Sequence, residues 1–281
     1  MIHALDLTEN DVCVIHYDRS RPAAEHRKLR ELISAVPGVI WQRPRKVAWG
    51  GYSLIAAQIE GIQIALNHSD KWTHWINLSG QCFPLQTPEC IRSYFEQRQD
   101  LSLISHFDPF IVWNNTQTRI GSYYLNFTPL DRLFRFPGIG RRLRGWCGQF
   151  PCLPIVHRPP PHFFRYYGSS NWVSLARRHA ALLTSSPKAR RVSVWLRWSL
   201  QPEEALFPSV LLNLDAHLDI TPDNGRYIIF EPGAVSPRTF TKSDIPALMG
   251  AICDGRLFAR KFDEAVDPAP LAEIAKMIAI S

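Results

Sequence analysis

The chain has 281 residues, of which 46% are hydrophobic and nine are tryptophan, so it can form a sizeable folded core and is not a disordered chain. Lysine and arginine number 32 against 25 for aspartate and glutamate, which gives a formal net charge of +7 at pH 7. This excess favours an anionic partner, whether a phosphorylated ligand, a membrane surface or nucleic acid, without choosing among the three.

The sequence predicts a cytoplasmic protein with reduced thiols. The opening residues, MIHALDLTENDV, have neither the basic start nor the apolar stretch of a signal peptide. No run approaches the 18 apolar residues that a membrane-spanning helix needs. The six cysteines are scattered along the chain, so we expect free thiols rather than a disulfide framework.

Strand and helix patterns alternate over the first hundred residues, which predicts an α/β protein. In the first predicted helix, Leu29, Leu32 and Ile33 are expected to face the core. Gly50 and Gly51 open the second helix. The expected elements are a strand at 11–18, helices after Pro22 and over 52–66, a strand within 72–80, and a short helix from Pro88.

Residues 107–165 differ from the rest because they are rich in Pro, Gly, Arg and aromatic residues and show no clean period. We interpret this segment as a long excursion from the core of a single domain that spans 1–281. Regular patterns then return. The expected elements are strands at 171–176, 226–231 and 256–262, and helices at 176–183, 202–213, 243–252 and 267–279.

Several polar residues fall where strands end or helices begin, which is where open α/β sheets bind ligands. These are Asp18, residues 79–81, and the pair Glu203 and Glu204. Ordinary turn and cap chemistry is the commoner explanation for each one taken singly, and acidic residues suit the first turn of a helix. If Glu204 faces a cleft, it can act as a general base toward a hydroxyl group.

Two features of the excursion suggest binding sites. Cys147, Cys152, His157 and His162 follow one another at five-residue intervals, but zinc sites usually pair their ligands two to four residues apart, so we expect no metal site. The basic stretch at 132–145 suits contact with anionic lipid at the inner membrane face, although a solvated loop is the alternative. No nucleic-acid-binding motif is present, and we expect no such partner.

Four stretches occur in an order that identifies a family: WINLSGQCFPLQTPE, YYGSSNWVSLARRHAALL, PEEALFPSVLLN and LFARKFD. Together they resemble the core-2/I-branching β-1,6-N-acetylglucosaminyltransferases, a family that also contains peptide O-xylosyltransferases, and bacterial-type members look most similar. The resemblance implies a GT-A-like α/β fold, with a mixed central sheet flanked by helices. It also implies inverting transfer from a UDP-sugar without a metal ion. In agreement, no two aspartates of this chain lie two residues apart, so the Asp-x-Asp metal motif of other GT-A enzymes is absent.

The resemblance assigns the chemistry to a few positions. Glu204 matches the catalytic base, and Lys261 matches the lysine that binds the diphosphate. Arg226 matches the arginine partner of that lysine, with Arg238 as the alternative. Arg260 is expected to face the other way and to pair with a structural carboxylate.

The resemblance also assigns residues to the nucleotide side and to the sugar and acceptor side of the predicted site. The nucleotide side comprises Asp18, Trp49, Gly50 and Tyr52. The sugar and acceptor side comprises Ser79, Gly80, Gln81, Ser169, Ser170 and Trp172, although Trp172 also suits a core position. Family members carry a further strand and helix ahead of the strand that ends at Asp18. We therefore expect either a late start of this sequence or a reduced nucleotide pocket.

The predicted function is metal-independent, inverting transfer of N-acetylglucosamine or xylose to an acceptor hydroxyl, on a glycan or a surface polysaccharide. The first alternative is a degenerate relative that binds a sugar nucleotide or glycan without turnover. A basic scaffold for membrane or nucleic acid is the second. A glycoside hydrolase is disfavoured because no second carboxylate is placed as partner to Glu204.

Overall fold

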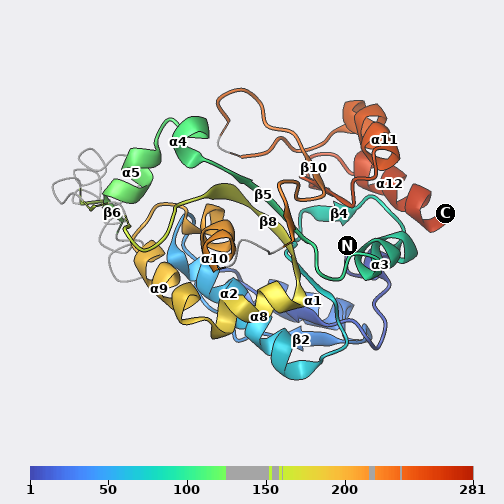
Figure 1. The fold of residues 1–281 in the computed structure, drawn as a ribbon. Helices are drawn as coiled ribbons and strands as arrows, with labels where there is room; N and C mark the ends of the chain where they lie inside the picture. Colours follow the sequence, from blue (N-terminus) through green and yellow to red (C-terminus); the bar gives the residue numbers. More distant parts are fainter. Residues whose placement is uncertain (125–151, 154–157, 160, 215–218, 235, 281) are drawn as a thin grey trace.

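The computed structural model describes residues 1–124, 152–153, 158–159, 161–214, 219–234 and 236–280. It is a mixed α/β structure, as the sequence predicts, with helices packed around two mixed sheets (Figure 1). The basic stretch at 132–145 lies outside the described residues, as do Cys147 and His157.

The central sheet has four strands in the order β3-β8-β5-β9. Its longest strand, β8 (Gly168–Ala176), pairs antiparallel with β3 (His74–Ile76) on one edge and with β5 (Ser102–Phe107) on the other. The short β9 (Ile220–Thr221) adds in parallel to β5. Val173 and Leu175 of β8 are fully buried, which explains why the sequence reads as a strand there.

A smaller sheet, β10-β11-β4, brings distant parts of the chain together. β11 (Phe258–Arg260) pairs in parallel with β10 (Arg226–Ile228) and antiparallel with β4 (Cys82–Pro84). In this register Arg260 lies between Ile228 and Cys82. The sheet thereby places the LFARKFD stretch beside the turn that follows Ser79.

The N-terminal part forms a separate parallel pair, β1 (Cys13–Ile15) with β2 (Val39–Trp41). Between them lies α1 (Ala23–Leu32), which has no buried residue. The expectation that Leu32 faces the core is wrong, since this side chain is 62% exposed. Ile33, which caps the helix, is buried instead.

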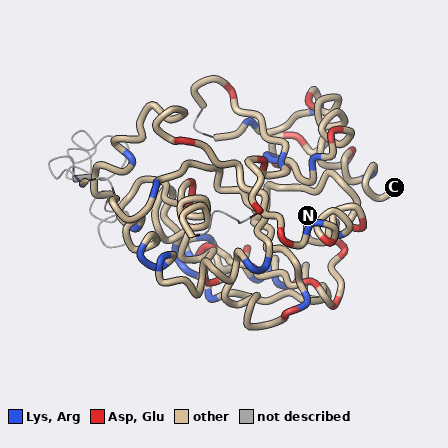
Figure 2. The backbone as a smooth tube through the Cα atoms, in the orientation of Figure 1, with Lys and Arg blue, Asp and Glu red and all other residues tan. Residues whose placement is uncertain are grey.

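Four helices cover the central sheet on one side, in the lower half of Figure 1. They are α2 (Tyr52–His68), α8 (Arg177–Ser185), α9 (Pro187–Leu196) and α10 (Leu206–Leu214). Their apolar faces meet β8 in the largest core cluster, which includes Ile55, Leu196 and Phe207. Figure 2 shows several lysine and arginine positions along α8 and α9, at its lower left. Of these, Arg178, Arg190 and Arg191 are exposed.

The helix predicted over 202–213 is divided in two. Residues Pro202–Glu204 form a 3-10 turn, η2, and α10 begins only at Leu206. Gln201, just before the turn, has a left-handed backbone with φ 47°. Glu203 and Glu204 therefore lie on a tight turn ahead of the helix rather than in its first turn.

The described part of the 107–165 excursion has regular structure at its start. It contains α4 (Pro109–Val112), α5 (Thr116–Gly121), and the strand pair β6 (Tyr123–Tyr124) and β7 (Cys152–Leu153). The carbonyl group of Arg119 in α5 accepts a hydrogen bond from the Leu200 amide at 3.1 Å. This bond fixes α5 against the turn that carries Glu204.

The C-terminal helices α11 (Ile245–Cys253) and α12 (Ala269–Ile280) follow the 3-10 turn η3 (Lys242–Asp244) and form a second core with β4 and β11.

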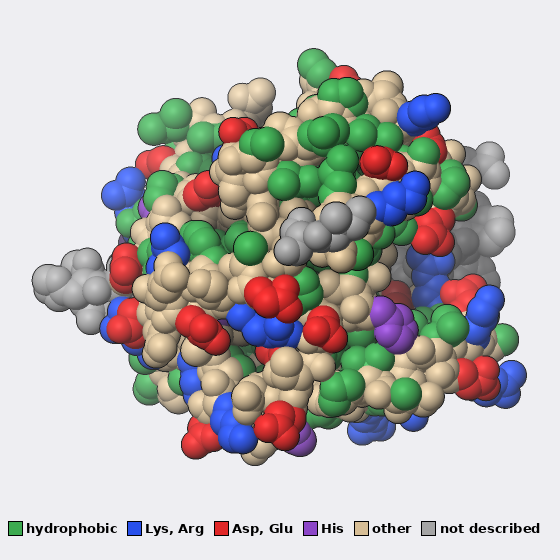
Figure 3. All heavy atoms as spheres, turned by 90° about the vertical axis from the view of Figure 1, so that its right-hand side faces the viewer, with side chains coloured by type: hydrophobic (Ala, Val, Ile, Leu, Met, Phe, Trp, Pro, Cys, Tyr) green, Lys and Arg blue, Asp and Glu red, His purple; other side chains and the backbone are tan. Residues whose placement is uncertain are grey.

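On the face drawn in Figure 3, acidic and basic side chains are interspersed rather than segregated by sign. Among the described residues, no helix is long and apolar enough to cross a membrane.

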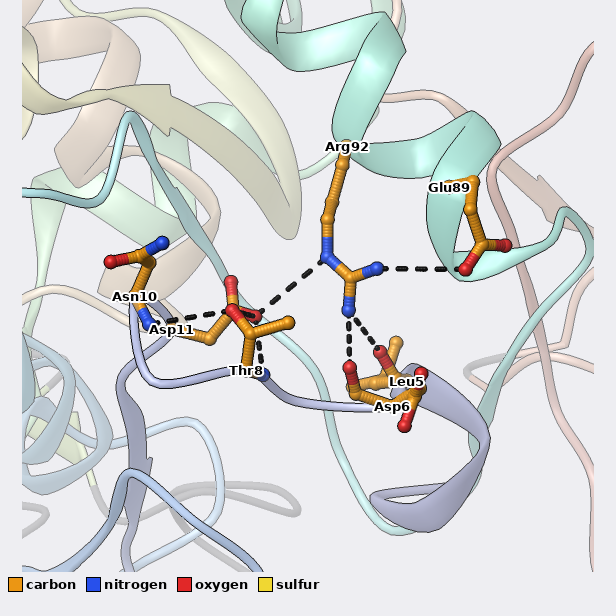
Figure 4. A network of polar contacts seen from close by, with 7 residues as sticks. All are labelled: Leu5, Asp6, Thr8, Asn10, Asp11, Glu89 and Arg92. Atoms are coloured by element: carbon orange, nitrogen blue, oxygen red, sulfur yellow. Dashed lines mark hydrogen bonds and ion pairs between the residues drawn. The ribbon is translucent and has the colours of Figure 1, made fainter.

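Arg92 joins the N-terminal segment to α3 (Pro88–Glu96), as Figure 4 shows. Its guanidinium group donates to the backbone carbonyls of Leu5 and Asp6, and it pairs with Asp11 and Glu89 at 3.8 Å each. Asp11 also accepts hydrogen bonds from the Thr8 amide and hydroxyl at 2.8 Å. Arg92, whose side chain is 28% exposed, thus holds residues 5–11 in place ahead of β1.

Candidate functional site

The two adjacent carboxyl groups of η2 lie in different environments. Glu204 is 27% exposed, and its Oε2 accepts a 2.6 Å charge-assisted hydrogen bond from Arg119 Nη1. Glu203 is 6% exposed, and its Oε2 has no hydrogen-bond partner among the described residues. The part-exposed Glu204 is the one that a ligand can reach, in line with its predicted role.

Burial raises the pKa of Glu203 to about 8, with a further contribution from the neighbouring Glu204 carboxylate, while its own backbone amide and Arg119 act in the opposite sense. Near neutral pH, Glu203 is therefore protonated. The nearby Tyr166 hydroxyl is also buried without a partner among the described residues, and burial raises its pKa as well. The pair thus presents one neutral acid and one ion-paired carboxylate.

Replacing Glu203 by glutamine is expected to stabilise the protein relative to wild type by an amount that increases as the pH rises. The unfolded chain loses this proton near the ordinary pKa of 4.5, whereas the folded chain keeps it to about pH 8. Between those values the folded state binds more protons, so the free energy of unfolding falls as pH rises, by about 1.4 kcal/mol for each pH unit. Thermal melts at pH 5 and pH 8 should show Glu203→Gln gaining several degrees on wild type. The exposed Glu9→Gln is the control and should keep a constant difference.

The residues predicted for the nucleotide side lie around the turn formed by Trp49, Gly50 and Gly51. Asp18 Oδ1 accepts from the Ser20 amide at 2.9 Å and from the Val47 amide at 3.3 Å. Partial burial alone would raise the pKa of Asp18, but these hydrogen bonds and nearby His16 bring it below its ordinary value. Asp18 therefore holds, as a carboxylate, the loop that leads to the half-exposed Trp49.

The same turn reaches the base region. Gly50, with a left-handed φ of 66°, has its carbonyl bonded to the Gln201 amide at 3.0 Å. Only a glycine adopts this conformation without strain. Tyr52 points elsewhere, because its hydroxyl bonds Ser193 in α9 and its ring lies 5.3 Å from the Arg197 guanidinium. Hydrogen bonds thus link Asp18 to the loop that leads to Gly50, and Gly50 to Gln201, which precedes the turn that carries Glu204. The Tyr52 hydroxyl points toward α9 instead.

The environment of Arg260 corrects the prediction for it. Its guanidinium lies 4.5 Å from the centre of the Trp172 ring, and it donates to Ser79 Oγ. The expected structural ion pair is not found among the described residues. Trp172 thus supports a cation through its aromatic face rather than filling the core.

Lys261 follows directly and is half-buried. Its side chain forms no hydrogen bond or ion pair within the described part of the chain. Its carbonyl accepts from the Phe240 amide at 2.8 Å, which places residues 238–240 beside it. Arg238, 38% exposed, pairs there with Glu231 at 3.2 Å and with the carboxylate of Asp244.

Arg226, in contrast, lies inside the protein. It is 5% exposed, and its guanidinium donates to the carbonyl oxygens of Asn77, Val173 and Asn224. Burial lowers its pKa to about 10. These bonds tie β10 to β8 and to the end of β3, so the group is already occupied in joining the two sheets.

The remaining predicted residues have different surroundings. Gln81 bonds Asp263 through its side chain at 3.3 Å, and its carbonyl accepts from Phe262, which docks the 79–81 turn beside Lys261. Gly80 is exposed, and an added Cβ would meet nothing within 4 Å, so its backbone borders open space. Ser170 Oγ accepts from Asn224 Nδ2 at 2.9 Å. Ser169 is buried and bonds only the adjacent backbone.

A cavity of about 510 Å³ opens between β1 and β3. All residues of both strands line it, together with apolar residues of segment 1–7, and His16, Ser79 and Gly80 add polar groups. Within the described chain, β1 pairs only with β2 and β3 only with β8. A cavity of this size falls in the range of small-molecule sites.

In the part of the chain that the structure describes, no group of three or more His, Cys, Asp or Glu side chains is placed to hold a metal ion. His162 is exposed, and the other three residues of the five-residue series lie outside what is described at side-chain level.

Sequence reasoning missed Arg119 and the tryptophan beneath it. Arg119 lies 4.0 Å from the centre of the Trp113 ring and donates to Asn115 Oδ1 at 3.0 Å. Both residues belong to the excursion that was interpreted as irregular. The signal available was Asp108-Pro109, a typical helix start, whose carboxylate accepts from the Phe110 amide.

Residues 3–249 match the family model described as Core-2/I-Branching enzyme. Xylosyltransferase oxt from Drosophila pseudoobscura pseudoobscura is 25% identical over 287 residues, which cover 95% of this chain and 30% of that protein.

Two further relatives are named as N-acetylglucosaminyltransferases. The probable beta-1,3-galactosyl-O-glycosyl-glycoprotein beta-1,6-N-acetylglucosaminyltransferase 7 of Sus scrofa is 24% identical over 201 residues, 71% of this chain and 42% of the relative. Its Homo sapiens counterpart is 22% identical over 297 residues, 95% of this chain and 61% of the relative. The chain thus spans 30% to 61% of the length of these three proteins.

Proposed function

Because the chain belongs to the core-2/I-branching enzyme family, we propose that it is an inverting glycosyltransferase with a GT-A-like fold, which moves N-acetylglucosamine or xylose from a UDP-sugar to an acceptor hydroxyl. The relatives named above are a xylosyltransferase and N-acetylglucosaminyltransferases, which motivates these two sugars. A hydroxyl of a glycan or surface polysaccharide is the proposed acceptor.

One observation carries the donor side of the proposal. At the end of β11, Arg260 and Lys261 follow each other, and neither pairs with a carboxylate among the described residues. Two partly buried cations without a counter-ion suit an anionic ligand, and the diphosphate of UDP supplies one. Fixed positive charges there would stabilise the leaving group as the sugar–phosphate bond breaks.

Between the two candidate partners of Lys261, we favour Arg238. The Arg226 guanidinium is buried and donates to three carbonyl oxygens, so recruiting it for phosphate would break the junction between the sheets. Arg238 is part-exposed on a segment bonded directly to Lys261 through Phe240. Its ion pairs with Glu231 and Asp244 hold it in place without burying it.

Glu204 is the proposed base. Its carboxylate would take the proton of the acceptor hydroxyl while that oxygen attacks the anomeric carbon on the face opposite UDP. The new carbon–oxygen bond forms as the bond to the β-phosphate oxygen breaks, and an α-linked donor yields a β-linked product. The cationic groups take the place that a divalent metal has in Asp-x-Asp enzymes, so transfer should not require a metal ion.

The test combines ligand-induced stabilisation with product analysis in EDTA. A UDP-sugar at a hundred times its dissociation constant should stabilise the fold by about 2.7 kcal/mol, which a melting curve detects. The sugar that stabilises is then offered with hydroxyl acceptors, and NMR identifies the anomer formed. Retention of the α-configuration, or transfer only when Mn²⁺ is added, would overturn the proposed mechanism.

A further inference from the structure

The base region contains a residue with no assigned role. Arg119 comes from α5, outside the four stretches that identify the family, and it makes the 2.6 Å contact to Glu204 Oε2. Its side chain is 11% exposed, so the ion pair is largely shielded from water. Shielding strengthens the pair relative to a surface salt bridge.

Arg119 is held from several sides. Its Nε donates to Asn115 Oδ1 at 3.0 Å, its guanidinium stacks 4.0 Å from the Trp113 ring centre, and its carbonyl accepts from the Leu200 amide. A planar guanidinium satisfies the stacking and two hydrogen bonds at once, which a lysine ammonium does not. These contacts fix the position of the Arg119 guanidinium, and with it the position of the Glu204 carboxylate that it binds.

The charged and titratable groups around Glu204 are few. Arg119 comes from α5, Glu203 from η2 itself, and Tyr166 and Arg158 from the segment before β8. Arg158 bonds Ser199 and the Trp195 carbonyl and stacks on the Trp195 ring, so it serves the α9 side. Arg119 is thus the cation in direct contact with Glu204.

The geometry points to Arg119 as the positioning residue of the base: it binds Oε2 of Glu204 and leaves Oε1 to receive the acceptor proton. This role rests on the proposed transferase function. Oε1 forms no hydrogen bond with any described residue. The guanidinium thus binds one of the two neighbouring carboxyl groups, Glu204, whereas Oε2 of the buried Glu203 has no hydrogen-bond partner among the described residues.

The test is the pH dependence of kcat/KM for wild type, Arg119→Met and Arg119→Lys, whose acidic limb reports the ionisation of the base. Losing an adjacent cation should move this limb of Arg119→Met up by about one pH unit or more. Misplacement of the carboxylate should also lower the plateau by up to about a hundredfold. Arg119→Lys keeps the charge, so its limb should stay while its plateau falls. UDP binding, measured by calorimetry, should be unchanged in both.

Arg165→Met is the matched control, since Arg165 forms an exposed 3.1 Å pair with Asp108 next to α4, and it should leave the profile unaltered. Carbon-13 NMR titration of the carboxyl groups, with Glu204→Gln to assign the signal, measures the Glu204 ionisation without turnover. It remains informative even if Arg119→Met folds poorly, because Arg119→Lys and wild type can be compared.

The outcomes separate the two proposals. An unmoved acidic limb and an unmoved Glu204 signal in Arg119→Met, with Glu204→Gln inactive, would refute the positioning role alone. Full activity of Glu204→Gln would refute the base and the proposed function, whatever the NMR titration shows for the ion pair.

Discussion

Glu204→Gln is expected to lose transfer activity by about 10²–10⁴-fold, the usual contribution of a general base, while its affinity for UDP stays close to wild type. Glutamine has the shape of the glutamate and accepts the Arg119 hydrogen bond through its carbonyl oxygen. It cannot take the proton of an acceptor hydroxyl near neutral pH. Initial rates at saturating donor, with UDP affinity measured by calorimetry on the same samples, test the prediction.

The neighbouring Glu203 supplies the control for that substitution. Glu203→Gln makes the same chemical change one residue earlier, in a buried side chain whose carboxyl group is already neutral. It should retain activity to within a few-fold. A variant pair in which Glu203→Gln is inactive and Glu204→Gln is active would reverse the assignment of the two carboxyl groups. Activity in both would favour a base elsewhere, whereas donor binding without activity in wild type and both variants would favour a protein that does not turn the donor over.

The elements with a clear period could be predicted from the sequence, and the contacts between them could not. The residues NWVSLA predict β8, whose last four residues are all buried, and the helical period behind Gly51 predicts α2, whose buried residues recur with that period. Leu32 was misplaced because α1 packs so lightly that none of its residues is buried. The helix α9 was missed although Ser186 and Pro187 form a typical start signal, with Ser186 accepting from the Ala189 amide.

The candidate site shows the same division. Glu204 and Lys261 lie in short motifs that a resemblance can identify. The partner of Arg260 is Trp172, 88 residues earlier on another sheet, and nothing local in LFARKFD indicates it. Similarly, only the packing of α5 against Leu200 brings Arg119 to Glu204. The choice between Arg226 and Arg238 required burial, which separates two arginines that the sequence treats alike.

Lys261→Met is expected to weaken UDP binding about tenfold to hundredfold, and to lower kcat/KM by at least that factor. A charge-assisted hydrogen bond contributes about 1.5–3 kcal/mol, and methionine keeps the apolar stem while removing the charge. Calorimetric titration with UDP in EDTA measures the change in affinity directly. Lys276→Met is the matched control: it lies on α12, is 71% exposed, and should bind UDP as wild type does.

The two arginines should then respond in different ways. Arg238→Met is expected to weaken UDP binding and to lower the melting temperature of the free protein less than Arg226→Met does. Its buried partner Asp244 loses this ion pair but keeps hydrogen bonds from the Thr241 amide and hydroxyl. Arg226→Met removes a donor from three carbonyl oxygens, of which that of Val173 keeps its bond from the Asn77 amide. Each group left unsatisfied costs about 1–3 kcal/mol, so the substitution should lower the melting temperature before any ligand is added. If Arg226→Met instead folds with normal stability and loses UDP affinity, the buried arginine is the phosphate ligand and the sheets must open to admit the donor. If Lys261→Met binds UDP as tightly as Lys276→Met, the cations at the end of β11 serve some other anion, and the donor site must be sought at the cavity between β1 and β3.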